Sequence, residues 1–566
     1  MEHRGRHSTP SPVDDLRQAA HEWAVDDPDP QTRAELEAVI TAAEGGDPAA
    51  VADLTDRFTG LLQFGTAGLR GALGAGPNRM NRAVVIRAAA GLVAHLRQGT
   101  ETPFVVIGRD ARYKSDAFAI DTAAVVTAAG GRAALLPEPL PTPVLAFAIR
   151  HLGADAGVMV TASHNPPQDN GYKVYLGDGS QIVPPVDEQI ADRITRVESV
   201  ASVARAESGW EVLGDEIVEA YLTAITAVVA PDTPRDVRIL HTSLHGVGDV
   251  TVQRAFARAG FPEPRRVPGQ AEPDPDFPTV NFPNPEEDGA LDLALAAARE
   301  ASPDLVIAND PDADRCAVAV PDAQVDGGWR LLRGDELGAL LASHLIMRGV
   351  PEGRRMANSI VSSRLLAAMC ELAGVPHEET LTGFKWIARV PDLHYGYEEA
   401  LGYCVAPDLV KDKDGISAAL LIAELTAVLK AEGRSLQSVL DDLHTRLGVH
   451  ATDALSVRVS DLTDLGVLMD RLRAAPPVEL AGSPVTDADD LSLGDGRLPP
   501  TDGLRYLLAD ATRIIVRPSG TEPKLKVYLE AIEPVDRHED LAAARERAAA
   551  RLAAVRAAME RLTALP

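Results

Sequence analysis

The chain has 566 residues and a formal net charge of -28 at pH 7, and 45% of its residues are hydrophobic. This length exceeds what one hydrophobic core supports and predicts about three to five domains. The acidic balance disfavours nucleic acid and anionic membranes as partners, because both would be repelled. A site for a phosphorylated ligand would therefore need locally clustered cations.

The sequence predicts a soluble protein of a reducing compartment. The N-terminus lacks the apolar stretch of a secretory signal. The most apolar helix-like run, 416–429, contains Glu424 and predicts a buried helix and not a membrane span. The three cysteines, at positions 316, 370 and 404, follow no metal-site spacing, and their odd number argues against a disulfide framework. We therefore expect a cytoplasmic protein.

Lysine is rare, since only eight of the 55 basic residues are lysines. Arginine serves as the general surface cation, so the remaining lysines are candidates for positions that need a compact ammonium or a mobile proton. Six of the eight lie in the motif stretches described below: Lys173, Lys385, Lys411, Lys413, Lys524 and Lys526.

The first 58 residues predict an N-terminal helical extension, with a break at Asp27-Pro28-Asp29-Pro30. A glycine-rich stretch around Arg70 follows, at 63–71. Glycines beside an arginine let backbone amides and a guanidinium approach an oxyanion closely. A flexible turn explains that stretch equally well when it is taken alone.

Strands alternate with helices over the next 100 residues. Short apolar runs at 104–107, 132–136 and 156–160 predict strands, separated by helical stretches, and this order favours a mostly parallel sheet. The last run ends in Thr161-Ala162-Ser163-His164-Asn165-Pro166. The Asn-Pro step disfavours helix, so Ser163 is expected on a tight loop at a strand end, where α/β proteins place their chemistry. The stretch 170–175 predicts a hairpin strand that returns Lys173 toward that serine.

A second α/β unit carries a candidate metal site. Its strand at 305–308 leads into Asn309-Asp310-Pro311-Asp312-Ala313-Asp314-Arg315. Carboxylates at alternate positions of an extended segment point the same way and can converge on one cation, and such oxygen ligands suit Mg²⁺. An EF-hand is disfavoured, because the glycine and the terminal glutamate of that loop are missing. A solvated acidic turn is the plainer alternative.

Two later units carry further polar loops. The third contains 380–386 and 395–402, where Glu398 and Glu399 stand beside aromatic residues, a combination common in sugar sites but weak evidence alone. The last unit contains Arg517-Pro518-Ser519-Gly520-Thr521 before the alternating strand 524–529. An arginine, two hydroxyls and a glycine-flanked backbone are typical of a phosphate cradle. A hydroxyl nucleophile, a metal site and a separate phosphate anchor together indicate phosphoryl transfer on a phosphorylated substrate.

The four loops at 161–166, 310–315, 396–402 and 517–521 resemble, in order and spacing, the signature loops of the α-D-phosphohexomutases. The stretches 282–287 and 383–387 resemble the phosphoglucomutase/phosphopentomutase branch. The resemblance implies an α/β protein with four domains around a central cleft, three of them α/β units with mixed sheets and the last an α+β domain. The expected boundaries are 1–58 for the extension, then 59–213, 214–328, 329–449 and 450–566.

The resemblance also implies a role for each site residue. Ser163 would be a phosphoserine in the resting enzyme and, with Asp310, Asp312 and Asp314, would bind Mg²⁺. His164 and Lys173 would be the proton-transfer candidates, and Arg70 would lie by the transferring phosphate. A sugar 1,6-bisphosphate would be both intermediate and activator. The expected substrate-binding residues are Arg315, Thr382, Gly383, Lys385, Glu398, Lys413, Arg517, Ser519, Gly520 and Thr521.

Substrate identity is left open by two departures from the family pattern. Ala400 stands where the family usually has a serine beside the glutamates, and the loop at Thr382-Gly383-Phe384 lacks the histidine of the phosphomannomutase/phosphoglucomutase branch. We favour glucose phosphate as the substrate, with mannose and pentose phosphates as alternatives. We expect a monomer or homodimer that binds small sugar phosphates and neither nucleic acid nor membrane.

Three other classes of protein compete with a mutase. A sugar bisphosphate synthase would share the fold and use an acyl-phosphate donor. A serine-dependent phosphatase would require a second metal with histidine ligands, and no histidine lies near Asp310 in the sequence. A non-catalytic sugar-phosphate-binding module would have lost Ser163 or the aspartates, and all of these residues are present.

Overall fold

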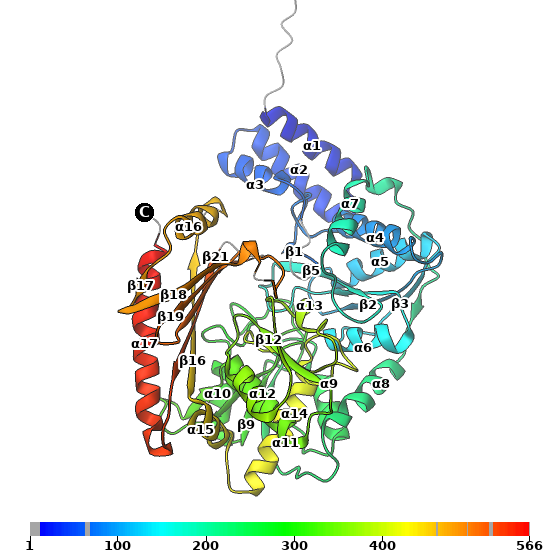
Figure 1. Ribbon diagram of the computed structural model, residues 1–566. Helices are drawn as coiled ribbons and strands as arrows, with labels where there is room; N and C mark the ends of the chain where they lie inside the picture. Colours follow the sequence, from blue (N-terminus) through cyan, green and yellow to red (C-terminus); the bar gives the residue numbers. More distant parts are fainter. Residues whose placement is uncertain (1–11, 63–67, 460–461, 495, 520–523, 565–566) are drawn as a thin grey trace, which may run out of the picture. The chain divides into compact units, whose positions relative to one another are not determined.

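The computed structural model describes residues 12–62, 68–459, 462–494, 496–519 and 524–564 (Figure 1). The chain forms two compact units. The first comprises Met1–Glu219, His245–Val247 and Pro273–Asn284, and the second comprises Ala220–Leu244, Gly248–Glu272 and Pro285–Pro566. Among the described residues, no helix combines the length and the apolarity needed to cross a bilayer.

The N-terminal extension consists of helices α1 (Pro12–Asp26), α2 (Pro30–Glu44) and α3 (Pro48–Phe58), as the sequence predicts. Helices α2 and α3 begin in the same way, with an aspartate N-cap followed by a proline whose missing N–H has no helical partner to lose. The extension has a small apolar core of its own, formed mainly by alanines with Leu36, Ile40 and Leu54.

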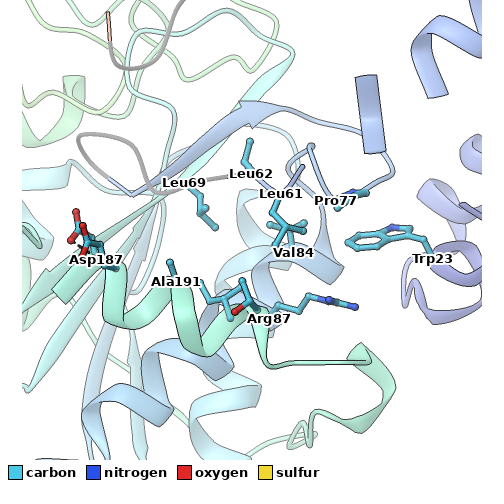
Figure 2. Close-up of a pocket in the computed structure, with 12 residues that line it drawn as sticks. Trp23, Leu61, Leu62, Leu69, Pro77, Val84, Arg87, Asp187 and Ala191 are labelled. Carbon is cyan, nitrogen blue, oxygen red and sulfur yellow. Dashed lines mark hydrogen bonds between the residues drawn. The ribbon is translucent and has the colours of Figure 1, made fainter. Parts of the chain in front are cut away.

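Trp23 of α1 lies where the extension meets the first sheet-bearing domain. It lines a pocket of about 300 Å³ together with Leu62, Leu69 and Val84 (Figure 2). The Arg87 guanidinium lies 5.1 Å from the centroid of the Trp23 ring. None of the predicted site residues that the structure describes lines this pocket, whose walls come from the extension and the first domain.

The first sheet is mixed, as predicted. β2, β3, β4 and β6 run parallel, whereas β5 pairs antiparallel with both β4 and β1. All five residues of β4 are buried, which explains its uninterrupted apolar sequence. The strand order is β1 (Leu69–Ala72), β5 (Asp169–Leu176), β4 (Ala156–Val160), β2 (Phe104–Arg109), β3 (Arg132–Leu135), β6 (Glu211–Val212). The accompanying helices are α4 (Arg82–Leu96), α5 (Ser115–Ala128), α6 (Thr142–Leu152) and α7 (Val186–Thr195).

The second and third sheets are also mixed. The second has the order β11 (Trp329–Leu331), β10 (Ala317–Pro321), β9 (Leu305–Ala308), β7 (Ile239–Thr242), β8 (Arg265–Arg266). The third has the order β13 (His377–Thr380), β12 (Arg355–Ser359), β14 (Leu393–Glu398), β15 (Gly402–Cys404). Their helices are α8 (Glu216–Ile225), α9 (Asp249–Arg258), α10 (Asp292–Ala301), α11 (Gly334–Arg348), α12 (Leu365–Ala373), α13 (Phe384–Ile387), α14 (Gly415–Ala431) and α15 (Leu436–Leu447).

The run at 416–429 is a buried helix, α14, as predicted. Its one acidic residue, Glu424, is fully buried and accepts hydrogen bonds from the Ala230 N–H, the Thr233 hydroxyl and His344 Nε2 at 2.8–2.9 Å. These donors compensate the carboxylate for its lost hydration. An acidic residue can therefore lie in the middle of this apolar helix.

The C-terminal domain is α+β, as predicted, with an entirely antiparallel main sheet. Helix α17 (Leu541–Leu562) packs along β16 and β21 (Figure 1). Its stripe of Leu552, Val555 and Met559 enters the core. The strand order is β16 (Val449–Arg458), β21 (Lys524–Glu533), β20 (Arg513–Pro518), β19 (Leu504–Leu508), β18 (Ser483–Asp490), β17 (Glu479–Leu480), and the remaining helix is α16 (Leu462–Ala474).

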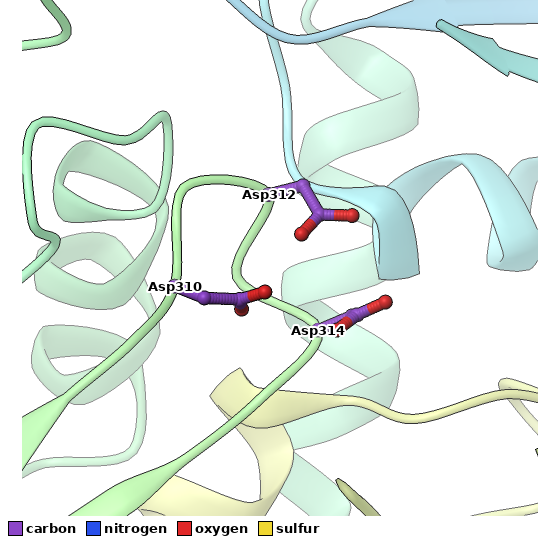
Figure 3. Close-up of side chains that lie close together, drawn as sticks. All are labelled: Asp310, Asp312 and Asp314. Carbon is purple, nitrogen blue, oxygen red and sulfur yellow. The ribbon is translucent and has the colours of Figure 1, made fainter. Parts of the chain in front are cut away.

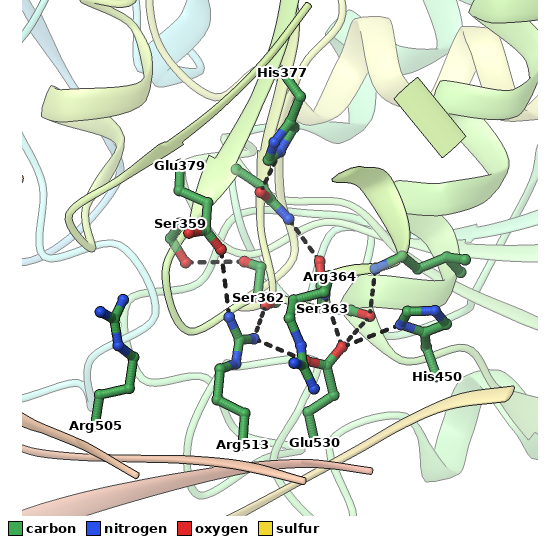
Figure 4. Close-up of polar contacts among 12 residues, drawn as sticks. Ser359, Ser362, Ser363, Arg364, His377, Glu379, His450, Arg505, Arg513 and Glu530 are labelled. Carbon is green, nitrogen blue, oxygen red and sulfur yellow. Dashed lines mark hydrogen bonds and ion pairs between the residues drawn. The ribbon is translucent and has the colours of Figure 1, made fainter. Parts of the chain in front are cut away.

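A buried carboxylate joins this last sheet to the third domain. Glu530 of β21 is 2% exposed and accepts hydrogen bonds from the Ser363 hydroxyl at 2.8 Å and from Arg364 Nε at 2.6 Å (Figure 4). Arg513 Nη2 lies 3.1 Å and His450 Nδ1 lies 3.5 Å from its carboxylate. Burial alone would raise the pKa of Glu530, but Arg513, His450 and Arg364 hold it well below its usual value.

We expect Glu530→Gln to destabilise the protein by about 3–5 kcal/mol at pH 7, because Arg364 and Arg513 would lose their shared counter-charge. Since the folded-state pKa is depressed, this stabilisation is complete above the ordinary value of 4.5 and is lost progressively as the pH falls from there through the folded-state pKa. Urea unfolding at pH 7, and again at pH 4 where the loss begins, would measure both effects. Glu560→Gln, which breaks the exposed pair with Arg556, is the control; equal losses in the two variants would contradict the prediction.

Candidate active site

Ser163 lies on a tight turn directly after β4, as predicted. Its φ of 51° is in the left-handed region, its N–H donates to Thr161 Oγ1 at 2.9 Å, and its side chain is almost fully buried. Its hydroxyl lies 3.2 Å from Nδ1 of His164. A hydroxyl in contact with an imidazole on a strained strand-end turn permits proton transfer during group transfer.

Arg70 and Lys173 approach this turn through strand pairing. β1 and β5 run antiparallel with Arg70 opposite Gly171, and Arg70 Nη1 donates to Asn165 Oδ1 at 3.1 Å. Lys173 is 3% exposed and lies opposite Met159 of β4, so β5 does return it beside the Ser163 strand. Gly68, with φ 99°, permits the approach of the chain to β5, because a Cβ there would lie 2.1 Å from the Tyr172 carbonyl.

The three aspartates of the metal loop converge, but not for the reason expected. The loop after β9 is not extended: the Ala313 N–H donates to the Asp310 carbonyl at 2.8 Å and Ala313 has φ 52°, so the chain turns. The turn brings one carboxylate oxygen from each of Asp310, Asp312 and Asp314 within 4.8 Å of the others (Figure 3). The alternating, extended arrangement was therefore a wrong prediction of the local backbone.

The electrostatics of this loop favour a bound cation. All three carboxylates are fully buried, and burial together with the charges of Asp312 and Asp314 raises the pKa of Asp310 well above its ordinary value. Charges of one sign held this closely repel one another, and a shared cation or a proton offsets that repulsion. The donor set, three carboxylate oxygens, fits a hard divalent ion.

Cations and a glutamate surround the same loop within the second unit. Lys413 Nζ lies 3.3 Å from Asp314 Oδ2, and Arg315 Nε lies 3.9 Å from Asp310 Oδ2. Burial alone would lower the pKa of Lys413, but neighbouring carboxylates, among them Asp314 and Glu398, raise it above its usual value. Burial raises the pKa of Glu398, and Lys413 opposes that shift. The structure thus groups Glu398, Arg315 and Lys413 with the three aspartates.

The loop with Thr382, Gly383 and Lys385 connects β13 to the short helix α13. Gly383 has φ 103°, a conformation that favours glycine at this position. Lys385 is 9% exposed and its Nζ lies 5.8 Å from the centroid of the Trp386 ring. Lys413 Nζ lies 5.4 Å from the Phe384 ring, so this loop adjoins the group around Asp314.

The position of Glu399 depends on two serines that the sequence did not single out. Ser359 Oγ and Ser362 Oγ donate to Glu399 Oε2 at 3.1 and 3.0 Å, and the Glu399 N–H donates to Ser362 Oγ at 3.1 Å. Ser359 is the last residue of β12, which lies next to β14 in the sheet. The pair of serines at this strand end was the sequence feature that could have identified the contact with Glu399.

The last candidate loop is described in part. Arg517 lies opposite Lys526 in the pairing of β20 with β21, and the Ser519 N–H donates to the Lys524 carbonyl at 2.8 Å. Gly520 and Thr521 lie outside the described residues. The predicted site residues that the structure describes thus fall into two groups: Ser163, His164, Lys173 and Arg70 in the first unit, and the other described ones in the second. A metal bond from Ser163 to the aspartate loop would join the two units and stays a prediction.

Comparison with protein families identifies four consecutive domains in the chain. Family models of phosphoglucomutase/phosphomannomutase match residues 61–201 (α/β/α domain I), 219–325 (α/β/α domain II), 333–447 (α/β/α domain III) and 455–548 (C-terminal domain). These four domains in this order define a phospho-sugar mutase, an isomerase that transfers phosphate within its substrate. The chain belongs to the phosphoglucomutase/phosphomannomutase family, within the α-D-phosphohexomutases.

Similar proteins carry several substrate names. A Haemophilus influenzae protein named "Probable phosphomannomutase" is 48% identical over 457 residues, which cover 80% of this chain and 93% of the relative. The human phosphopentomutase is 35% identical over 541 residues, covering 85% and 87%. A crystal structure from Thermus thermophilus that carries a phosphomannomutase name has a TM-score of 0.67 at 28% identity, covering 87% of this chain and 99% of its own.

Proposed function

We propose that this phospho-sugar mutase interconverts the 1-phosphate and 6-phosphate of a hexose through a phosphoserine at Ser163 and a bound 1,6-bisphosphate. The contact of the Ser163 hydroxyl with His164 Nδ1, at 3.2 Å on a buried strand-end turn, is the observation that carries the proposal. A serine placed in this way can carry a phosphoryl group and exchange a proton with a neighbour.

The transfer can be written with its atoms balanced. The free hydroxyl of the sugar monophosphate attacks the phosphorus on Ser163, the P–Oγ bond breaks, and the sugar bisphosphate forms. After the bisphosphate turns over, Ser163 Oγ attacks the phosphorus of the other phosphate and the P–O bond to the sugar breaks. The phosphoryl group returns to Ser163, and the sugar oxygen takes up a proton to become a hydroxyl. His164 and Lys173 are the candidates to take the hydroxyl proton and later to return it. Arg70, which reaches Asn165 in the same loop, would bind the transferring group.

Asp310, Asp312 and Asp314 would hold a Mg²⁺ ion, with Ser163 as a further ligand in the working enzyme. Such an ion neutralises charge on a phosphoryl group and so supplies electrostatic stabilisation. Lys413 and Arg315 would reinforce that charge from within the second unit. The fit rests on the three buried carboxylates, whose oxygens lie within 4.8 Å of one another.

Substrate binding would use the other loops of the second unit. Glu398 would accept hydrogen bonds from sugar hydroxyls, and Thr382, Gly383 and Lys385 would line the sugar site. Lys413 and Arg517, together with the loop Ser519-Gly520-Thr521, would hold the phosphate that is not transferred. Arginine suits this role because its guanidinium can pair with two phosphate oxygens at once.

We favour glucose as the sugar, with mannose and ribose or deoxyribose as alternatives. The absence of a histidine in the Thr382-Gly383-Phe384 loop is the sequence feature behind this preference. The name of the Haemophilus relative favours mannose, and the name of the human relative favours a pentose. All three sugars therefore belong in one assay.

The test measures all three substrates with one readout. Purified protein is incubated with Mg²⁺, a trace of the matching sugar bisphosphate and glucose 1-phosphate, mannose 1-phosphate or ribose 1-phosphate, and ³¹P NMR follows the movement of phosphate. We expect turnover that requires the bisphosphate and is fastest with glucose 1-phosphate. A faster rate with either other sugar would contradict the preference for glucose and leave the mutase chemistry intact.

A bisphosphate synthase would give a different pattern. The protein would be a bisphosphate synthase and not a mutase if folded protein gave no turnover with any of the three sugar phosphates but formed a bisphosphate from an acyl-phosphate donor.

We also propose a cellular compartment for the protein. All three cysteines are buried thiols, which supports a reducing cytoplasm.

A further inference from the structure

The turn that carries Ser163 cannot be held by its own backbone alone. Two prolines, Pro166 and Pro167, follow Asn165 and offer no N–H groups, so the peptide bonds there cannot join a regular ladder. Local bonds run from the Asn165 N–H to the Ala162 carbonyl and from the Asp169 N–H to the Pro166 carbonyl, both at 3.1 Å. Carbonyls in such a loop need donors from elsewhere.

One arginine supplies those donors. The buried guanidinium of Arg112 donates to four carbonyls of the loop. Its Nη2 reaches Ser163 O at 2.7 Å and Asn165 O at 2.5 Å. Its Nη1 reaches Pro166 O at 2.8 Å and Asp169 O at 3.2 Å. A planar guanidinium with several N–H groups can donate to all four carbonyls at once, whereas a lysine ammonium is a single point charge without this fork geometry.

The guanidinium is itself held from two further sides. Asp110, at the end of β2, lies 3.4 Å from Arg112 Nε. The ring of Phe277 lies 4.8 Å from the guanidinium carbon and is 2% exposed, a cation–π contact shielded from water. Phe277 belongs to Pro273–Asn284, which is far from Arg112 in sequence yet packs in the same compact unit.

The segment around Phe277 is anchored independently of that ring. Tyr113 donates its hydroxyl to Asp276 Oδ1 at 2.9 Å. His245 is connected to the same segment twice: its carbonyl accepts from the Asp274 N–H at 3.0 Å, and its Nε2 lies 2.7 Å from Thr279 Oγ1. The ring is therefore presented to the guanidinium by a fixed stretch of backbone.

We propose that Arg112, with Phe277 stacked on it, is a positioning residue that sets the backbone of the Ser163 loop for phosphoryl transfer. In a trans peptide the C=O and N–H point in opposite directions, so fixing the Ser163 carbonyl on Arg112 turns the His164 N–H to the other side of the peptide plane. The orientation of Ser163 and His164 then depends on the hydrogen bonds that Arg112 donates to the loop. This inference rests on the proposed role of Ser163 as the phosphoryl carrier.

Two variants test this role of Arg112 and Phe277. Arg112→Lys keeps the charge and removes the fork, and Phe277→Leu keeps an apolar side chain and removes the ring face. Arg109→Lys, a conservative change at the last residue of β2 and three positions before Arg112, is the matched control. Hydrogen exchange of peptides covering 161–170 reads the order of the loop without any substrate, and steady-state kinetics separate kcat from KM.

We expect faster exchange over 161–170 in both variants, with kcat lowered about 10²-fold in Arg112→Lys and about 10-fold in Phe277→Leu. KM should stay within about threefold of wild type, since ground-state binding is not the target of the change. Exchange or kcat indistinguishable from Arg109→Lys would overturn the proposal. If Arg112→Lys fails to fold, the exchange and kcat of Phe277→Leu decide whether the proposal stands. If wild type carries no phosphate on Ser163, the proposed function fails, and exchange alone decides whether Arg112 orders the loop.

Discussion

Replacing Ser163 with alanine is expected to lower kcat by at least about 10⁴-fold with every sugar phosphate, because the group that carries the phosphoryl would be missing. The substitution removes one oxygen from a buried turn and leaves the Thr161 and Arg112 contacts to the Ser163 backbone in place. The fold should therefore survive. ³¹P NMR of substrate conversion and intact mass of the protein, before and after incubation with the bisphosphate, would measure the two losses.

The matched control for this change is Ser202→Ala, an exposed serine of the same unit whose hydroxyl donates to the Ser199 carbonyl. It should retain wild-type turnover and acquire one phosphoryl group. Turnover near the wild-type rate in Ser163→Ala would remove Ser163 as the carrier. Loss of activity without any phosphoryl group on the wild-type protein would instead point to a role for Ser163 in binding.

The sequence was most informative where chemistry follows directly from a strand. The apolar run of β4 stops at a hydroxyl and an Asn-Pro step, so the position of Ser163 on a strand-end turn could be predicted from local rules alone. The same reasoning placed the aspartate loop after β9. The direction of Lys173 followed from a hairpin pattern, which the pairing of β4 with β5 confirms.

Contacts between distant positions escaped prediction because no local pattern encodes them. Arg112 follows β2, and its four carbonyl acceptors come together only when the proline-containing loop folds over it. Phe277 was assigned by sequence to the second domain, yet its segment packs in the first compact unit. Short-range periodicity carries no information about such a crossing segment.

The convergence of the three aspartates was predicted with the wrong backbone. Alternation in an extended segment would have placed their carboxylates on one side, whereas the observed turn relies on the left-handed Ala313. A positive φ at alanine is unfavourable by itself and is maintained by the surrounding structure, so residue preferences alone argued against it. The pattern of acidic residues was informative about the ligand and misleading about the local conformation.

Replacing Asp312 with asparagine is expected to lower kcat about 10²–10³-fold and to abolish stabilisation by Mg²⁺. Without the metal the same change should raise thermal stability, because it removes one of three mutually repelling buried charges. In the wild-type protein, Mg²⁺ at about 100 times its dissociation constant should add about 2.7 kcal/mol to the free energy of unfolding. Thermal unfolding of EDTA-treated protein with and without added Mg²⁺ measures both effects.

Asp326→Asn is the control, since this exposed aspartate of the same domain should affect neither activity nor the response to Mg²⁺. Calorimetric titration with Mg²⁺ would show one site in wild type and in the control, and none in Asp312→Asn. If the variant still binds and responds to Mg²⁺ as wild type does, the ion lies elsewhere. If the metal-free variant is less stable than metal-free wild type, the three carboxylates do not repel one another, and a proton or a neighbouring cation such as Lys413 already compensates their charge.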